Sequence, residues 1–458
     1  MDLKKITHRH IWSTGALAVL CCLMLYVLAS CSKVEPKEVV FEEKDKTILL
    51  YFASNNNLYQ DAASNISKII DGYIPSNGNI VLYCNNFDLS TRAMKDTLPL
   101  LVNVYKDAGG AKHIDTIYRF AYQNSCTKNA MKSVINITTT MCPAKEYGLV
   151  LWSHGTGWLP ANYYTLYPSS SSDDEKRAAA FAPSGLKEAA SRYARLQRNA
   201  PELVYERGGR SLLFPEPAGG VDPYAHMVKS FGSERGTEMS IFDIQEAIGD
   251  HFFDFIAIDA CLMGGIEIAY QLRGCCNYFI SSPAEILTDS FPYDTVIEDM
   301  FKADYSAVAK DVYDYYNAQS GDYHSVTIAT VKCSALETVA AEAAKLFEAY
   351  RDDIPSLDVT AVQRYFRYND HWFYDLKDFL DNLCGSSQTT AFSSALSSAV
   401  VAKYTTGQMI GLIIDPAKFS GLSCYINNPS DSGLDAYYQK YDWNTDAGMI
   451  VPTSSSED

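Results

Sequence analysis

Short apolar runs that alternate with helical patterns constrain the fold of this 458-residue chain more than any other feature. Each run is too short for an ordinary helix and stays apolar at successive positions, which is typical of strands buried on both faces of a sheet. Six segments predict such strands: residues 47–53, 79–84, 147–152, 253–259, 278–281 and 326–331. A more amphipathic segment at residues 114–122 predicts an edge strand.

Helical periodicity separates these runs. Ile66 and Ile70 share one helical face, Thr127 is a cap residue ahead of a second helix, and Ser240 with Asp243 predicts a capped third helix. Strands that alternate with helices imply βαβ units and a mainly parallel sheet covered on both faces. The predicted fold class is therefore α/β.

The remaining segments predict the domain boundaries. We expect the α/β domain to span residues 47–333, and the Ala-rich helices and short strands that follow predict a smaller C-terminal α+β subdomain at 334–452. A polar stretch at 160–236 is too long for an ordinary connection, which predicts a functional or processed insertion. Residues 453–458 are expected to form a disordered tail.

The N-terminus predicts export. A basic start and an apolar run at residues 11–28 lead into Leu-Ala-Ser-Cys, which resembles the lipobox of bacterial lipoproteins. This predicts a signal peptide at 1–30, lipid attachment at Cys31 and a polar tether at 31–46, so the protein would be anchored to a bacterial membrane at the cell surface or in the periplasm. The alternatives are a plain secretory signal and an uncleaved membrane anchor.

Charge and cysteine usage argue against nucleic-acid binding and against a metal site. The net charge of −17 argues against nucleic-acid binding, which needs clustered Lys and Arg. The 12 cysteines form no CxxC pair and no Cys/His cluster with zinc spacing, so no metal site is expected.

Two predicted strands end in reactive residues. His154 and Gly155 follow the strand at 147–152, and Cys261 follows the strand at 253–259. Because the carboxyl ends of parallel strands lie along one edge of an open sheet, we expect His154 and Cys261 to lie side by side. A lone cysteine after a buried strand is otherwise a small core residue, and only the pairing of two strand ends favours catalysis.

The chemistry of these residues suits nucleophilic catalysis. A helix that starts directly after Cys261 would favour its thiolate through the helix dipole. His154 could accept the thiol proton and later protonate a leaving amine. The amides of Gly155 and Cys261 could together form an oxyanion hole.

Both strand ends resemble the paired motifs of the clostripain peptidases, from the clan of caspases, gingipains and legumain. The motifs are Ser-His-Gly-Thr-Gly-Trp at 153–158 and Asp-Ala-Cys-Leu-Met-Gly at 259–264, and residues 419–425 add a looser likeness. The resemblance implies a caspase-like α/β/α sandwich and a Cys/His dyad without a third acid. It also implies an acyl-enzyme route to cleavage after Arg or Lys.

The resemblance also implies acids in the pocket for the basic P1 residue. Asp259 would share a strand face with Cys261 and could pair with a guanidinium, although it could equally be a carboxylate that orders a turn. A second acid is expected within residues 283–294, with Asp289 as the candidate and Asp294 in reserve. This stretch lacks the Gly-rich run often found in relatives.

Family members commonly cleave themselves between the histidine and the cysteine, which would give a two-chain enzyme. Arg177 is the candidate cleavage site here, and the alternative is a solvated linker that simply contains basic residues. Some relatives respond to calcium, but the sequence has no Asp-x-Asp-x-Asp-Gly loop, so we expect no obligatory cofactor.

We therefore predict a self-activating cysteine endopeptidase that acts on protein or peptide substrates with a basic P1 residue. The main alternative is a catalytically silent surface lipoprotein that binds peptide or glycan, which the 12% aromatic content would suit. A transpeptidase with the same acyl-enzyme chemistry is a further alternative. Intact His154, Gly155 and Cys261 favour the peptidase.

Overall fold

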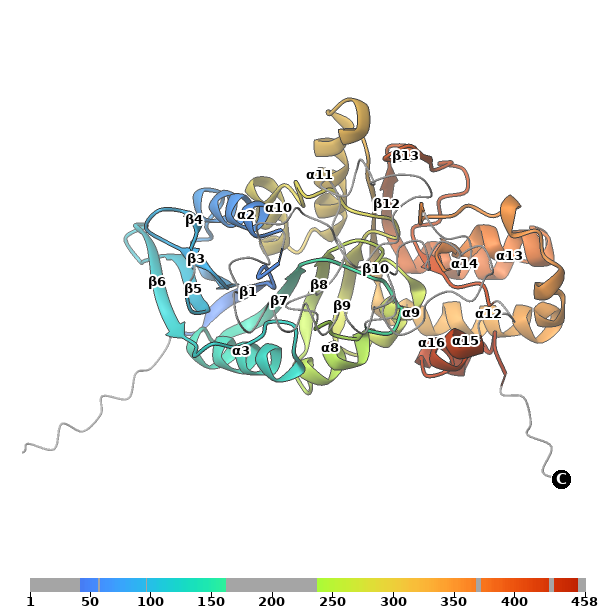
Figure 1. The fold of residues 1–458 in the computed structure, drawn as a ribbon, viewed down its shortest axis with the longest axis horizontal. Helices are drawn as coiled ribbons and strands as arrows, with labels where there is room; N and C mark the ends of the chain where they lie inside the picture. The colour runs from blue at the N-terminus through green and yellow to red at the C-terminus, as the bar shows by residue number, and fades with distance from the viewer. Residues whose placement is uncertain are drawn as a thin grey trace, which may run out of the picture. The chain divides into compact units, whose positions relative to one another are not determined.

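A mixed sheet organises the computed structural model, which describes residues 42–56, 58–95, 97–161, 237–367, 372–427 and 432–451. Its strands are β1 (Lys44–Phe52), β2 (Gly78–Cys84), β5 (Leu100–Lys106), β6 (Lys112–Arg119), β7 (Ala144–Trp152), β8 (Phe253–Asp259), β9 (Cys276–Ser281), β10 (Thr327–Lys332) and β12 (Val400–Thr405). Within the described residues these nine strands follow the order β12-β10-β9-β8-β7-β1-β2-β5-β6 (Figure 1).

The centre of the sheet is parallel and both edges are antiparallel. Strands β2, β1, β7, β8 and β9 pair in parallel. At one edge β5 and β6 run antiparallel to their neighbours, and at the other edge β10 and β12 do so. The predicted α/β class is confirmed, with antiparallel strands added outside the parallel centre. The predicted edge strand is β6.

Helices cover both faces of the sheet (Figure 1). On one face lie α2 (Tyr59–Asp71), α10 (Tyr293–Phe301) and α11 (Tyr305–Asn317), and on the other lie α3 (Lys128–Met141), α8 (Ile241–Ile248) and α9 (Ile266–Gln271). The predicted caps are present. Thr127 accepts a hydrogen bond from the Ala130 amide at the start of α3, and Ser240 forms a capping box with Asp243 at the start of α8.

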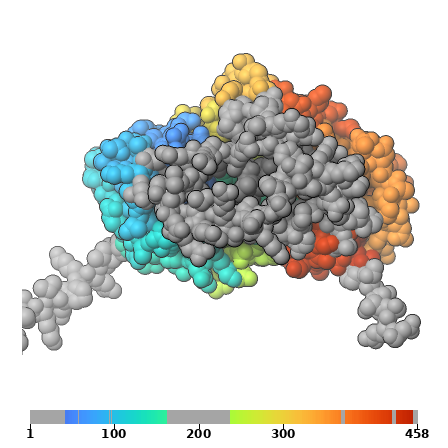
Figure 2. Space-filling model, in the orientation of Figure 1, coloured from blue at the N-terminus to red at the C-terminus, as the bar shows by residue number. Residues whose placement is uncertain are grey.

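The C-terminal elements pack at the β12 end of the sheet. They include α12 (Leu336–Tyr350), α13 (Leu376–Cys384), α14 (Thr390–Ala399), α15 (Ser432–Tyr438) and α16 (Asp442–Ala447), with the short strands β11 (Tyr374–Asp375) and β15 (Ser423–Cys424). In Figure 2 these elements (orange to red) lie at the opposite end from β5 and β6. The predicted domain boundary at residue 333 falls between β10 and α12, and β12 returns to the sheet beyond it.

Several predictions fall outside the described residues. These are the signal peptide at 1–30, lipid attachment at Cys31, most of the tether, Arg177 with nearly all of the insertion, and the tail at 453–458. Strand β1 begins at Lys44, so the last residues assigned to the tether belong to the sheet. Among the helices of the described ranges, none has the length and hydropathy needed to cross a bilayer.

Candidate active site

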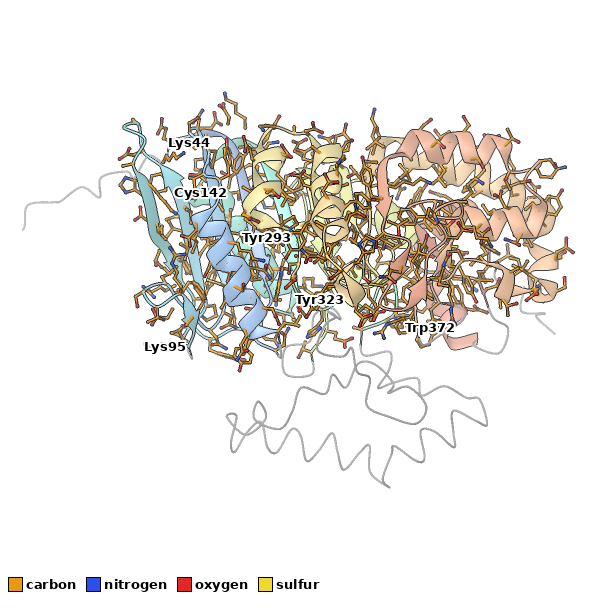
Figure 3. The ribbon with its side chains drawn as sticks, turned by 90° about the horizontal axis from the view of Figure 1, so that it is seen from above. Lys44, Lys95, Cys142, Tyr293, Tyr323 and Trp372 are labelled. Atoms are coloured by element: carbon orange, nitrogen blue, oxygen red, sulfur yellow. The ribbon has the colours of Figure 1, made fainter. Side chains whose placement is uncertain are left out.

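The two strands with reactive ends are neighbours, as predicted. β7 and β8 pair in parallel, with Trp152 opposite Asp259 at their carboxyl ends. The segments that carry His154 and Cys261 therefore leave the sheet at the same edge. Figure 3 shows Lys44, at the start of β1, on one side of the molecule and Trp372 on the other. The carbonyl of Trp372 accepts a hydrogen bond from the Trp158 indole at 2.8 Å, so Trp372 lies beside the segment that follows β7.

Gly155 packs directly against the backbone of Cys261. A Cβ atom at position 155 would lie 2.2 Å from the carbonyl oxygen of Cys261 and 2.9 Å from its amide nitrogen. Both distances are shorter than any van der Waals contact, so only glycine fits here. The contact brings the two segments together at the amides predicted for the oxyanion hole. The side chains of His154 and Cys261 are both buried.

The backbone amide and carbonyl of Ile286 both contact the sulfur of Cys261. The Ile286 amide donates a hydrogen bond to Sγ at 3.1 Å, and the thiol lies 3.5 Å from the Ile286 carbonyl oxygen as a donor. Ile286 belongs to the loop that follows β9. The shorter contact, from the amide, favours a thiolate at Cys261, whereas the longer contact with the carbonyl favours the neutral thiol. Nothing in the sequence pattern around Ile286 indicated this contact.

The helix predicted directly after Cys261 is absent. The prediction that its dipole favours the Cys261 thiolate was therefore wrong. Helix α9 begins at Ile266. Leu262 adopts a positive φ of 62°, and its amide bonds the Ala284 carbonyl at 2.8 Å, while the Gly264 amide bonds the Ser282 carbonyl at 2.7 Å. These bonds to the loop after β9 hold Cys261 and Leu262 in a turn instead of a helix. A leucine with positive φ is rare, and such strain is typical of functional sites.

Asp259 is fully buried beneath this edge. Its Oδ2 accepts hydrogen bonds from the Tyr293 hydroxyl at 2.7 Å and from the Phe291 amide at 3.3 Å. Burial, followed by the charge of Asp259, raises the pKa of Tyr293 well above its ordinary value. Because β8 ends at Asp259, the alternation of strand faces does not extend to Cys261. The contacts of Asp259 also fit the alternative of a carboxylate that orders a turn, and its role at P1 stays a prediction.

The other predicted acids differ in exposure. Asp289 is half-buried and accepts a hydrogen bond from Tyr315 at 3.4 Å, whereas Asp294 is exposed in the first turn of α10. Sequence reasoning missed Glu285, which is fully buried in the same loop and forms a two-point ion pair with Arg367. Arg367 lies 82 positions away, and no local pattern connects the two residues.

Glu267 connects α9 to the C-terminal elements. This buried residue in the first turn of the helix accepts a hydrogen bond from the Tyr425 amide at 2.8 Å through Oε1. The hydroxyl of Tyr438 also interacts with this carboxylate, and the hydroxyl of Ser423 has no hydrogen-bond partner among the described residues. Burial raises the pKa of Glu267 to about 7.

Among the residues that the structure describes, no group of three or more His, Cys, Asp or Glu side chains could hold a metal ion.

Comparison with known proteins gives a family match over most of the chain. The model of the clostripain family matches residues 50–196 and 225–457. An inactive zymogen of a C11 protease from Parabacteroides distasonis is 27% identical with a TM-score of 0.66, over 89% of this chain and 99% of that chain.

Two further solved structures share the fold. A secreted C11 cysteine protease from Bacteroides thetaiotaomicron, in complex with an irreversible peptide inhibitor, is 24% identical with a TM-score of 0.61, over 88% of this chain and 98% of that chain. Another secreted C11 cysteine protease from the same organism is 19% identical with a TM-score of 0.65, over 89% of this chain and all of that chain. No curated protein sequence matches the chain.

Proposed function

The chain belongs to the clostripain family of cysteine peptidases, and we propose that it cleaves peptide bonds after Arg or Lys with Cys261 as nucleophile and His154 as base. The observation that carries the proposal is the contact of Gly155 with the Cys261 backbone, where two adjacent parallel strands end.

In the proposed reaction, His154 takes the thiol proton and the Cys261 sulfur attacks the scissile carbonyl carbon. The amides of Gly155 and Cys261 donate to the oxyanion of the tetrahedral intermediate. His154 then protonates the leaving amine, and the acyl group stays on the sulfur. Water, deprotonated by His154, attacks this thioester and releases the acid and the free thiol.

For the P1 residue, exposure favours Asp289 over Asp259. Asp289 is half-buried, whereas Asp259 is fully buried and already accepts two hydrogen bonds. Glu285 is already paired with Arg367. We therefore assign the direct contact with the P1 guanidinium or ammonium to Asp289. The buried Asp259 would attract the same cation through its negative charge without touching it.

We further propose that the protein is made as a zymogen, exported, and anchored through Cys31. Burial of both His154 and Cys261 supports a form that substrate cannot reach. Likeness to a solved C11 zymogen at 27% identity supports the same idea. Cleavage at Arg177 would produce the two-chain enzyme, and N-terminal sequencing of both mature chains tests the anchor and the cut together.

Fluorogenic peptides with Arg, Lys or Ala at P1 test the activity. We expect hydrolysis of the basic peptides by the wild type and by Cys142→Ala, which alters a buried cysteine elsewhere in the fold, but none by Cys261→Ala. Asp289→Asn should reduce cleavage of Arg peptides far more than cleavage of neutral ones. Peptide binding without any hydrolysis that depends on Cys261, even after proteolytic activation, would favour the silent surface lipoprotein instead.

A further inference from the structure

A buried ion pair lies one residue from the amide that contacts Cys261. The Nε atom of Arg367 donates to Oε2 of Glu285 at 2.6 Å, and its Nη2 atom donates to Oε1 at 3.0 Å. The side chain of Glu285 is fully buried and that of Arg367 is 10% exposed. Two parallel hydrogen bonds between a guanidinium and a carboxylate fix the position of both groups.

Hydrogen bonds on either side of Glu285 hold the loop, and the Ser282 hydroxyl donates a long one, 3.5 Å, to the Glu285 carbonyl. The Ala284 amide bonds the Thr327 hydroxyl at 3.2 Å, and the Ala284 carbonyl accepts from the Leu262 amide at 2.8 Å. The Ile286 amide, 3.1 Å from the Cys261 sulfur, belongs to the same peptide unit as the Glu285 carbonyl, and the two shorter bonds from Arg367 to the Glu285 side chain add to what fixes this unit.

We propose that Arg367 is a positioning residue for the nucleophile: through Glu285 it holds the Ile286 amide on the sulfur of Cys261. The inference rests on the proposed role of Cys261 as nucleophile. Loss of the guanidinium would leave a buried carboxylate without its partner, which is strongly unfavourable. Glu285 would then turn toward water, and the adjacent Ile286 amide would move with it. The thiolate would lose its amide donor.

Alkylation of Cys261 by iodoacetamide tests this after limited proteolysis of the full-length chain, because Cys261 is fully buried in the uncleaved form. The rate is measured against pH by mass spectrometry of the peptide that contains Cys261. For Arg367→Met we expect the midpoint of the profile to move to higher pH, with alkylation below the midpoint slowed about tenfold, the effect of losing one hydrogen bond to a charged group. The midpoint for Arg367→Lys should lie between those of the wild type and Arg367→Met, because an ammonium cannot bond both carboxylate oxygens as a guanidinium does.

A matched control separates positioning from general destabilisation. Lys46 forms a comparably buried ion pair with Asp254 at 2.7 Å near the start of β1, so Lys46→Met should lower stability and leave the alkylation midpoint unchanged. If Arg367→Met does not fold, the double variant Glu285→Gln/Arg367→Met leaves no buried charge and should shift the midpoint in the same direction.

Two results would overturn the proposal: an unchanged midpoint in the folded Arg367 variants, or an equal shift in Lys46→Met. The alkylation assay and the peptide assay can fail separately. A shifted midpoint without any peptide hydrolysis would support the positioning and contradict the proposed function. Hydrolysis with an unshifted midpoint would support the proposed function and contradict the positioning.

Discussion

Replacing Glu267 by Gln should stabilise the protein at alkaline pH, because the fold buries an acid that water would ionise. Burial raises the pKa of Glu267 from 4.5 to about 7, so the folded state holds this proton more tightly than the unfolded state. The stabilising contribution of the protonated group is complete below pH 4.5. It is lost progressively as the pH rises to about 7, above which both states are ionised.

The size of the effect follows from the two pKa values. Each unit of difference corresponds to about 1.4 kcal/mol, so burying the ionised carboxylate costs roughly 3 kcal/mol at pH 8. A glutamine keeps the oxygen that accepts from the Tyr425 amide. The free energy of unfolding of Glu267→Gln, relative to wild type, should therefore rise by about 2 to 3 kcal/mol between pH 5 and pH 8.

Equilibrium urea unfolding, followed by far-UV circular dichroism at both pH values, measures this difference. The exposed Glu348 on α12 provides the control, and Glu348→Gln should change stability equally at the two pH values. A Glu267→Gln difference that is the same at pH 5 and pH 8 would refute the reasoning, because the carboxylate would then ionise alike in the folded and unfolded chains.

Two further substitutions test contacts at the site. Gly155→Ala should lower kcat/KM for a basic peptide by at least about 100-fold, since its Cβ would lie 2.2 Å from the Cys261 carbonyl oxygen and would displace catalytic groups. Gly274→Ala, where a Cβ meets nothing within 4 Å, should behave like wild type, and equal activity in both variants would contradict the prediction. Tyr293→Phe should lower the free energy of unfolding by about 1 to 3 kcal/mol, because it removes a 2.7 Å donor from buried Asp259. Unchanged stability in urea unfolding would show that Asp259 does not need this hydroxyl.

The features that the sequence predicted well are those encoded by local patterns. Apolar runs marked the strands that became β7 and β8, and their parallel pairing followed from the βαβ alternation. The caps at Thr127 and Ser240 were also local signals, since each side chain bonds a backbone amide three residues ahead.

Long-range contacts set the features that the sequence did not predict. The apolar pattern after Cys261 resembles a helix, but amides at 262 and 264 bond the loop after β9 instead. Gly264 and Gly265 were a readable sign that the helix would start later, since glycine disfavours helix interiors. No comparable sign exists for the Ile286 amide or for the pair of Glu285 and Arg367, because those contacts depend on tertiary placement alone.

The hydrogen bonds between the segment that follows Cys261 and strand β15 have a consequence for biosynthesis. The Ser423 amide bonds the Gly264 carbonyl at 3.0 Å, and the Tyr425 amide bonds Glu267. A ribosome must therefore complete most of the chain before the segment after Cys261 can acquire its last backbone partners. We expect a nascent chain that ends before residue 423 to lack a correctly shaped catalytic edge. The order of translation would then protect the producing cell from its own peptidase while the chain is still being made.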